Sequence, residues 1–401
     1  MSTSVAAGSD ESTSDQTRER RVHTDQRIGS IDGLRGIAIL GVIVVHCSAV
    51  LAGASIQLGP VDVTRLLISP GKYGVELFFV LSGLTLTLSL ERRLGREQYV
   101  FRSYFVRRLF RLSPLYYVVL ACTALAGYNN QLETGTTNPS ASPLNYAIHI
   151  AYAHGLSPEY ARSILGVTWS LTPEVVFYLL LPAIITYTST RKRIALFAAA
   201  LLGSVLWLKF GRMLLASSQT NAIWISLSPP ALLFVFLAGV LMAPVYRQHN
   251  AYIATRSEER SRHGDAILLV ALIGFFSSHY FGVLVPILPW LMISLGVLAY
   301  CLGSALMEAV LSIRPLRLLG TISYSAFLVH YPIVEYIVPV MASLADRLPS
   351  WLLYSAFVTA VGLTTVLISA ITYRFIERPG IALGDLLIGR YLGPRQAVEA
   401  R

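Results

Sequence analysis

The sequence predicts an all-α integral membrane protein built from a bundle of about ten transmembrane helices. Of its 401 residues, 54% are hydrophobic and only 13% are charged, whereas a soluble domain carries roughly 25% charged residues. Apolar runs long enough to cross a bilayer recur along the chain. The Lys and Arg residues are also distributed unevenly between the segments that join these runs. Together these observations exclude an ordinary soluble enzyme, a disordered chain and a nucleic-acid-binding module.

Ten apolar segments approach the length of about 20 residues that a spanning helix needs. The third and fifth are short, and Pro286 and Pro289 interrupt the chain between the seventh and eighth. The apolar segment 145–156 is too short to span, so we expect it to be interfacial or re-entrant. The ten segments are 31–53, 73–90, 112–128, 168–188, 194–211, 225–246, 265–281, 287–307, 321–343 and 351–373.

Three regions follow from this pattern. Residues 1–27 are rich in Ser, Thr, Asp, Glu and Arg and predict a disordered tail. Residues 28–380 form the membrane domain, and 381–401 form a C-terminal tail. No apolar segment follows the first methionine, so the sequence predicts no cleaved signal peptide.

The charge distribution predicts the orientation. With the N-terminus inside, 25 of the 32 Lys and Arg residues fall on the inner side and 6 on the outer side. This bias follows the positive-inside rule, so both termini and both tails are expected to be cytoplasmic. The net charge of +10 therefore requires no nucleic acid partner. The three cysteines lie far apart in apolar runs, and their spacing indicates neither a disulfide framework nor a metal site.

The first helix carries a polar stripe. Arg35 and His46 are eleven residues apart, close to three turns, so they share one helix face about 16 Å apart along the axis. Asp32, Ile39 and Val42 complete this stripe, which we expect to face the protein interior. Ionisable groups inside a membrane are functional candidates, and a neutral histidine can remove a proton from a hydroxyl. A packing histidine fits His46 equally well.

The loop before the third helix is rich in arginine. Arg108 and Arg111 are spaced i,i+3 and therefore lie on one helix face. Guanidinium groups suit phosphate oxygens. Membrane topology and anionic lipid headgroups explain the same residues, and composition alone favours that simpler interpretation.

The fourth helix opens with polar residues at helical spacing. Ser170, Glu174 and Tyr178 line one face, and Trp169 suits a membrane interface. Glu174 is expected at a depth similar to that of His46, where a carboxylate would orient the imidazole. Structural polar packing accounts for the spacing equally well.

Two further segments place polar groups in apolar helices. In the second helix, Glu76 enters from the outer side and fits an interfacial or supporting role, and Ser82 follows six residues later. In the ninth helix, His330 and Tyr331 precede Pro332, which should kink the helix. A buried, hydrogen-bonded histidine is the simpler interpretation of His330.

Six short motifs in register resemble acyltransferase family 3, the multi-pass membrane O-acyltransferases of bacteria. They span about residues 28–380. In two places the chain departs from the usual family pattern: Val175 takes the second position of an acidic pair, and Glu76 replaces an Asp. The motifs are Asp32–Gly36 followed by His46, Gly74–Gly83, Arg107–Tyr117, Trp169–Tyr178, Ser323–Pro332 and Ile376–Pro379.

The resemblance implies transfer of a small acyl group, commonly acetyl, from acyl-CoA to a hydroxyl. The acceptor would be a sugar of a surface polysaccharide or lipopolysaccharide, or a glycosylated small molecule. It also implies a site in the bacterial cytoplasmic membrane, no metal and no tightly bound cofactor. By the same resemblance His46 matches the catalytic histidine, with Arg35 as its partner, and Arg108 and Arg111 match a donor-binding pair.

From these residues we expect His46 to act as the base or the acyl carrier, with Glu174 orienting it. Ser82, Ser170 and Tyr331 are candidate oxyanion donors, and Glu76, Trp169, Tyr178 and His330 are candidate site-lining residues. The alternative is a transporter or flippase of a glycolipid, in which buried His and Glu residues relay protons.

Overall fold

The computed structural model describes residues 30–48, 57–58, 61–62, 69–126, 142–215, 218–253, 262–281, 287–344 and 347–392. The expected tail 1–27 lies outside these residues. The described chain is almost entirely helical, and its one small sheet is an antiparallel pair of β1 (Gln57–Leu58) and β2 (Val61–Asp62).

Each of the ten expected segments coincides with helix. After the helix Ser30–Ser48, the chain forms η2 (Ser69–Tyr73), α2 (Gly74–Arg93), α3 (Val100–Leu125), α5 (Pro143–Ile150), η4 (His154–Leu156), η5 (Gly166–Ser170), α6 (Leu171–Tyr187), α7 (Thr190–Leu206), η6 (Trp207–Gly211), α8 (Arg212–Leu215), α9 (Gln219–Leu227), α10 (Pro229–Ile253), α11 (Arg262–Phe281), α12 (Ile287–Cys301), α13 (Ala305–Leu311), α14 (Arg314–Thr321), α15 (Ser323–Ala342), α16 (Ser350–Thr372), η7 (Tyr373–Glu377) and α17 (Arg378–Tyr391).

Eight helices among the described residues are long and apolar enough to cross a membrane, and a ninth span is obtained if α12 and α13 count as one. These two helices meet at 93°, so the segment expected to be one straight helix at 287–307 is bent. The protein is a multi-pass helical membrane protein, as predicted, with eight or nine candidate spans among the described residues against the expected number of about ten.

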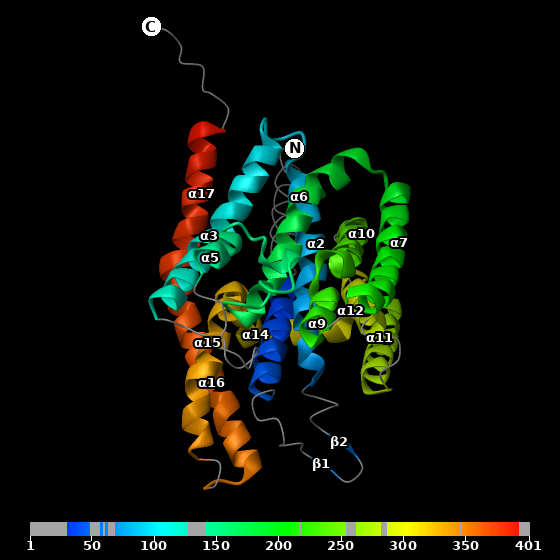
Figure 1. Ribbon diagram of the computed structural model, residues 1–401. Coiled ribbons are helices and arrows are strands. Elements are labelled where there is room, and N and C mark those ends of the chain that lie inside the picture. The colour runs from blue at the N-terminus through cyan, green and yellow to red at the C-terminus, as the bar shows by residue number, and fades with distance from the viewer. Residues whose placement is uncertain are drawn as a thin grey trace, which may run out of the picture.

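Two boundaries differ from those read from the sequence. The third helix, expected to begin at residue 112, begins at Val100, so its arginines lie on a helix and not in a loop. Salt bridges to Glu97 and Asp385 stabilise Arg107 within this charged first half of α3. The expected C-terminal tail begins inside α17, which continues α16 through the π-helical turn η7 and packs along α3 (Figure 1).

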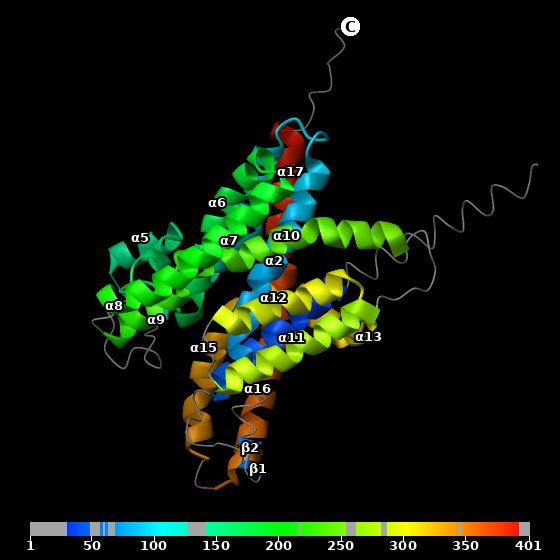
Figure 2. The same cartoon turned by 90° about the vertical axis from the view of Figure 1, so that its right-hand side faces the viewer.

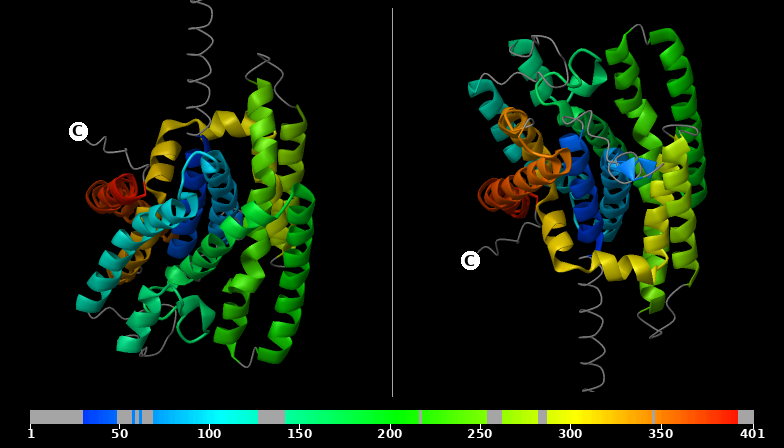
Figure 3. Two further views of the ribbon diagram at one scale, coloured as in Figure 1. Left: turned by 90° about the horizontal axis from the view of Figure 1, so that it is seen from above. Right: turned by 90° about the horizontal axis from the view of Figure 1, so that it is seen from below.

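The helix Ser30–Ser48 and α2 occupy the middle of the bundle. Seen along the bundle, α3, α15, α16 and α17 lie on one side of them and α7, α10, α11 and α12 on the other (Figure 3). The second view shows that α10 crosses α2 at a steep angle (Figure 2). The central position of these two helices buries Ile39, Val42 and Phe79 and places the polar stripe of the first helix inside the protein, as predicted.

The expected interfacial segment 145–156 forms α5 and η4. Its centre is a buried polar cluster in which the rings of His149 and His154 stack with centroids 4.0 Å apart. His149 bonds with the hydroxyls of Tyr116 and Ser163, and His154 Nε2 donates to the carbonyl of Thr168. These bonds tie the short segment to α3 and to η5.

Candidate active site

A polar cavity lies between the helix Ser30–Ser48 and α2, α3, α6 and α15. It holds about 90 Å³ of space. Seven of the residues singled out from the sequence line it, although they come from four different segments of the chain. These residues are Arg35, Ser82, Arg108, Arg111, Ser170, Glu174 and Tyr178. We call this cavity the arginine pocket.

The first helix delivers Arg35 to the arginine pocket through a tight helix contact. A Cβ atom on Gly36 would lie 2.2 Å from the carbonyl oxygen of Leu316, so only glycine permits α14 to approach this closely. Arg35 Nη1 forms a 2.9 Å salt bridge with Asp32, and Nη2 donates to Thr85 Oγ1 at 3.4 Å. The guanidinium is therefore held on the side of the helix that faces α2.

Helix α3 contributes two more guanidinium groups. Arg111 Nη1 lies 3.6 Å from Glu377 Oε1, and Arg108 Nε is buried without a hydrogen-bond partner among the described residues. A buried charged donor that lacks a partner is costly, so this atom is a candidate donor to an anionic ligand. In contrast, Arg107 is bonded to Glu97 and Asp385 outside the arginine pocket. The sequence alone does not show which of these neighbouring arginines enter the pocket and which form ion pairs outside it.

Glu174 lies opposite these cations. Its carboxylate accepts hydrogen bonds from Ser82, at 3.3 Å, and from Tyr178. The i,i+4 spacing of Glu174 and Tyr178 thus produces a direct contact, as the sequence suggested. The hydrogen bonds of Glu174 do not include His46, and its role in orienting that residue stays a prediction.

His46 lies beyond the arginine pocket, beside His330 and Tyr331. Its ring centroid is 5.1 Å from that of His330 and 5.5 Å from that of Tyr331. His46 Nδ1 is 2.8 Å from the carbonyl oxygen of Val42. Because a carbonyl only accepts, Nδ1 carries the hydrogen, and in the neutral ring Nε2 carries the lone pair. The backbone of its own helix therefore sets the tautomer that a general base requires.

His330 repeats this arrangement. Its Nδ1 donates to the carbonyl of Ala326 at 3.0 Å, and its Nε2 is buried without a partner among the described residues. The structure thus brings together two imidazoles in the same tautomer, a pairing that separate helices hid from the sequence.

Two phenylalanines separate the histidines from the arginine pocket. Phe78 and Phe327 both line this pocket, with ring centroids 6.4 Å apart. The ring of Phe327 also lies 5.9 Å from that of His330. The histidine pair therefore lies directly behind the aromatic wall of the pocket.

The remaining candidates lie further away. Trp169 packs edge-on against Phe79, and Glu76 is buried at the start of α2. Neither lines the arginine pocket. Sequence reasoning missed Tyr324, which lines this pocket and donates to the carbonyl of Leu112 at 2.7 Å. It also gave no role to Glu377, although it had singled out the segment that contains it.

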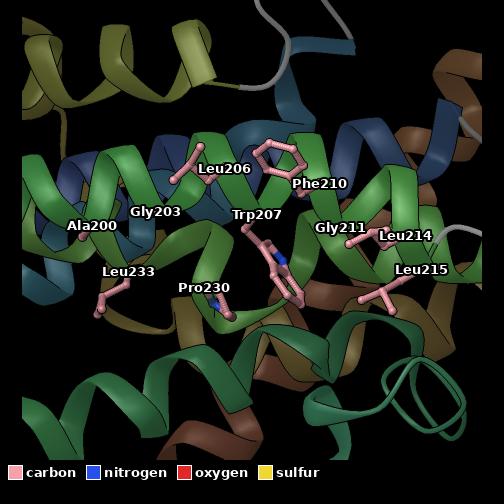
Figure 4. A pocket seen from close by; sticks show the side chains of 10 residues that line it. All are labelled: Ala200, Gly203, Leu206, Trp207, Phe210, Gly211, Leu214, Leu215, Pro230 and Leu233. Atoms are coloured by element: carbon pink, nitrogen blue, oxygen red, sulfur yellow. The ribbon is translucent and has the colours of Figure 1, made fainter.

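A larger groove lies between α7 and α10. It holds about 570 Å³, and Trp207 stands at its centre (Figure 4). Its lining is apolar, from Ala200 to Leu233, so it offers no group for acid–base chemistry. The arginine pocket and the histidine pair remain the candidate active site.

Comparison with known proteins places this site in a family context. A family model described as an acyltransferase domain matches residues 28–374. The chain is 25% identical over 375 residues to the peptidoglycan O-acetyltransferase OatA of Listeria monocytogenes. This alignment covers 88% of this chain and 55% of that protein. It is 25% identical over 379 residues to the putative peptidoglycan O-acetyltransferase YrhL of Bacillus subtilis, and this alignment covers 88% of this chain and 54% of that protein.

The O-acetyltransferase OatA of Staphylococcus aureus is 24% identical over 389 residues, covering 92% of this chain and 59% of that protein. The chain thus spans little more than half the length of the curated relatives it matches. No solved structure matches the chain.

Proposed function

The chain belongs to acyltransferase family 3, and from this premise we propose that it transfers an acetyl group from acetyl-CoA to a sugar hydroxyl at the bacterial cytoplasmic membrane. The observation that carries the proposal is the convergence of Arg35, Arg108 and Arg111 in one pocket whose wall residue Phe327 packs against His330, the ring neighbour of His46. The relative from Listeria monocytogenes is named a peptidoglycan O-acetyltransferase and that from Bacillus subtilis a putative one, so a cell-wall sugar is the proposed acceptor.

The arginine pocket would bind the phosphates of the donor. Three guanidinium groups line it, and guanidinium–phosphate pairs combine charge attraction with paired hydrogen bonds. Arg108 Nε, which is buried without a partner in the described chain, would donate to a phosphate oxygen. The orientation that the Lys and Arg distribution predicts would let the donor enter from the cytoplasm.

The thioester would pass Phe78 and Phe327 to reach His46. There Nε2 would remove the proton from the acceptor hydroxyl as its oxygen attacks the acyl carbon. The new carbon–oxygen bond forms, the carbon–sulfur bond breaks, and the imidazolium returns the proton to the CoA thiolate. The Nδ1 bond to Val42 keeps the other hydrogen on Nδ1 throughout this cycle, so Nε2 is the atom that gains and then loses the proton.

The negative charge on the carbonyl oxygen needs a donor. Of the three candidates, Tyr331 lies beside His46, whereas Ser82 and Ser170 lie in the arginine pocket. We therefore assign this role to Tyr331. Glu174 is bonded to Ser82 and Tyr178, and we assign it the role of balancing the charge of the arginines.

The test is release of CoA thiol from acetyl-CoA by the purified protein in lipid nanodiscs, with and without peptidoglycan fragments. Acceptor-dependent thiol release, with acetylated fragments detected by mass spectrometry, is the expected result. Transport of a glycolipid without thiol release would support the transporter alternative and overturn the proposal.

A further inference from the structure

We propose that Glu377 is the positioning residue that holds Arg111 in its donor-binding orientation, an inference that rests on the proposed function. The need for such a residue follows from the charges of the arginine pocket. Three guanidinium groups of like charge repel one another at short range. Two other carboxylates already lie near them: Asp32 bonds with Arg35, and Glu174 attracts both Arg108 and Arg111.

Glu377 supplies the third carboxylate. Its side chain is 0% exposed, and its Oε1 lies 3.6 Å from Arg111 Nη1. Its Oε2 accepts a 2.8 Å hydrogen bond from Ser325 Oγ on α15. A buried carboxylate is costly unless it is paired and hydrogen-bonded. Ser325 supplies the hydrogen bond to Oε2, whereas Oε1 has no hydrogen bond among the described residues and has Arg111 as its ion-pair partner. Glu377 therefore connects α15 to the arginine of α3.

The backbone around Glu377 is specialised for this position. Residues Tyr373–Glu377 form the π-helical turn η7, and single π turns within α-helices frequently mark functional sites. Immediately afterwards, a Cβ atom on Gly380 would lie 2.8 Å from Pro114 Cγ and 3.0 Å from the carbonyl oxygen of Phe110. The close approach of α17 to α3 at this glycine brings the carboxylate within reach of Arg111.

Without this carboxylate, Arg111 would experience repulsion from Arg35 and Arg108 that only Glu174, which it shares with Arg108, would offset. The Arg111 side chain is 31% exposed, so it has room to swing toward water. With Glu377 in place, one edge of the guanidinium is held and its other N–H groups face the pocket. Glu377 thus acts on donor binding through Arg111 and touches no reacting atom.

The test compares Glu377→Gln and Glu377→Asp with the wild type in acetyl-CoA titrations. The amide oxygen of Gln can still accept from Ser325, so this variant keeps the fold while it loses the charge. We expect the KM for acetyl-CoA to rise about tenfold with kcat nearly unchanged. The Asp variant keeps the charge on a shorter side chain, so its KM should fall between those of Glu and Gln.

If Glu377 had only a structural role, Glu377→Asp should raise the KM more than Glu377→Gln, because the shorter side chain loses the bond to Ser325 and leaves a gap. If Asp raises the KM more than Gln does, or if Gln leaves the KM unchanged, the proposal is wrong. Asp385→Asn is the matched control: this carboxylate also lies on α17 and pairs with an arginine of α3, but outside the arginine pocket. It should leave the KM unchanged.

A double-variant cycle separates positioning from a general effect. If Glu377 acts through Arg111, the KM of Arg111→Gln should not change when Glu377→Gln is added. Additive increases in KM would overturn the inference. Absence of thiol release by the wild type would instead overturn the proposed function, so the two failures are distinguishable.

Discussion

Replacing Arg108 by Gln removes one cation from the arginine pocket, together with the Nε donor that we propose binds a phosphate oxygen. Arg108 Nε is buried without a hydrogen-bond partner in the described part of the chain. A hydrogen bond to a charged group contributes about 1.5–3 kcal/mol. Since about 1.4 kcal/mol corresponds to a factor of ten in affinity, loss of this contact should weaken CoA binding roughly ten- to one-hundred-fold.

The assay is isothermal titration of CoA into the purified protein in nanodiscs. The substitution should not harm the fold, because Arg108 lies among other cations and its removal relieves repulsion. Arg107→Gln is the control, since Arg107 is the adjacent residue but is bonded to Glu97 and Asp385. We expect wild-type affinity from this control. Equal weakening by both substitutions would mean that CoA responds to the general surface charge, and unchanged affinity in Arg108→Gln would refute the donor pocket.

Two further predictions concern stability, measured by thermal unfolding in detergent. Gly239→Ala should destabilise the protein by about 1–3 kcal/mol, because the new Cβ would lie 2.1 Å from the carbonyl oxygen of Val80. The control is Gly362→Ala, whose new Cβ meets nothing within 4 Å and should leave the stability unchanged. Equal losses of stability in the two variants would contradict the close contact between α2 and α10. Burial, with the nearby His154 as a second cause, lowers the pKa of His149 to about 2, and burial lowers the pKa of His154 to about 4. Both values lie below the ordinary 6.5, so the unfolded chain binds more protons and stability should fall as the pH drops from about 6.5 toward 4. His149→Gln should flatten this dependence, and an unchanged pH profile in that variant would contradict it.

The sequence was sufficient for the helical membrane fold because apolar runs and charge bias depend on local composition. It also placed Arg35, Arg108, Arg111 and Glu174 in one candidate site, and the structure brings these four residues to a single cavity. Spacing along a helix determines which residues share a face. This is sufficient to predict contacts within one helix, such as that of Glu174 with Tyr178.

Contacts between distant segments could not be predicted in this way. The pairing of His46 with His330 depends on how the first helix packs against α15, and no local pattern encodes that packing. The same holds for Glu377 and Arg111, which meet only because α17 continues α16 past the expected end of the helix. The early start of α3 was missed because its arginines seemed too polar for a membrane helix, whereas carboxylates from other segments pair with them.

The most direct test of the central claim is acetylation by the His46→Ala protein. The wild type and the variant are expressed in the deletion strain of the host, and surface glycans are compared by mass spectrometry. The control is His263→Ala, because His263 lies outside the candidate site at the start of α11. The account predicts that one acetyl mass per modified sugar returns with the wild type and the control but not with His46→Ala, although all three proteins reach the membrane. Normal acetylation by the His46→Ala protein would contradict the assignment of His46 as the base.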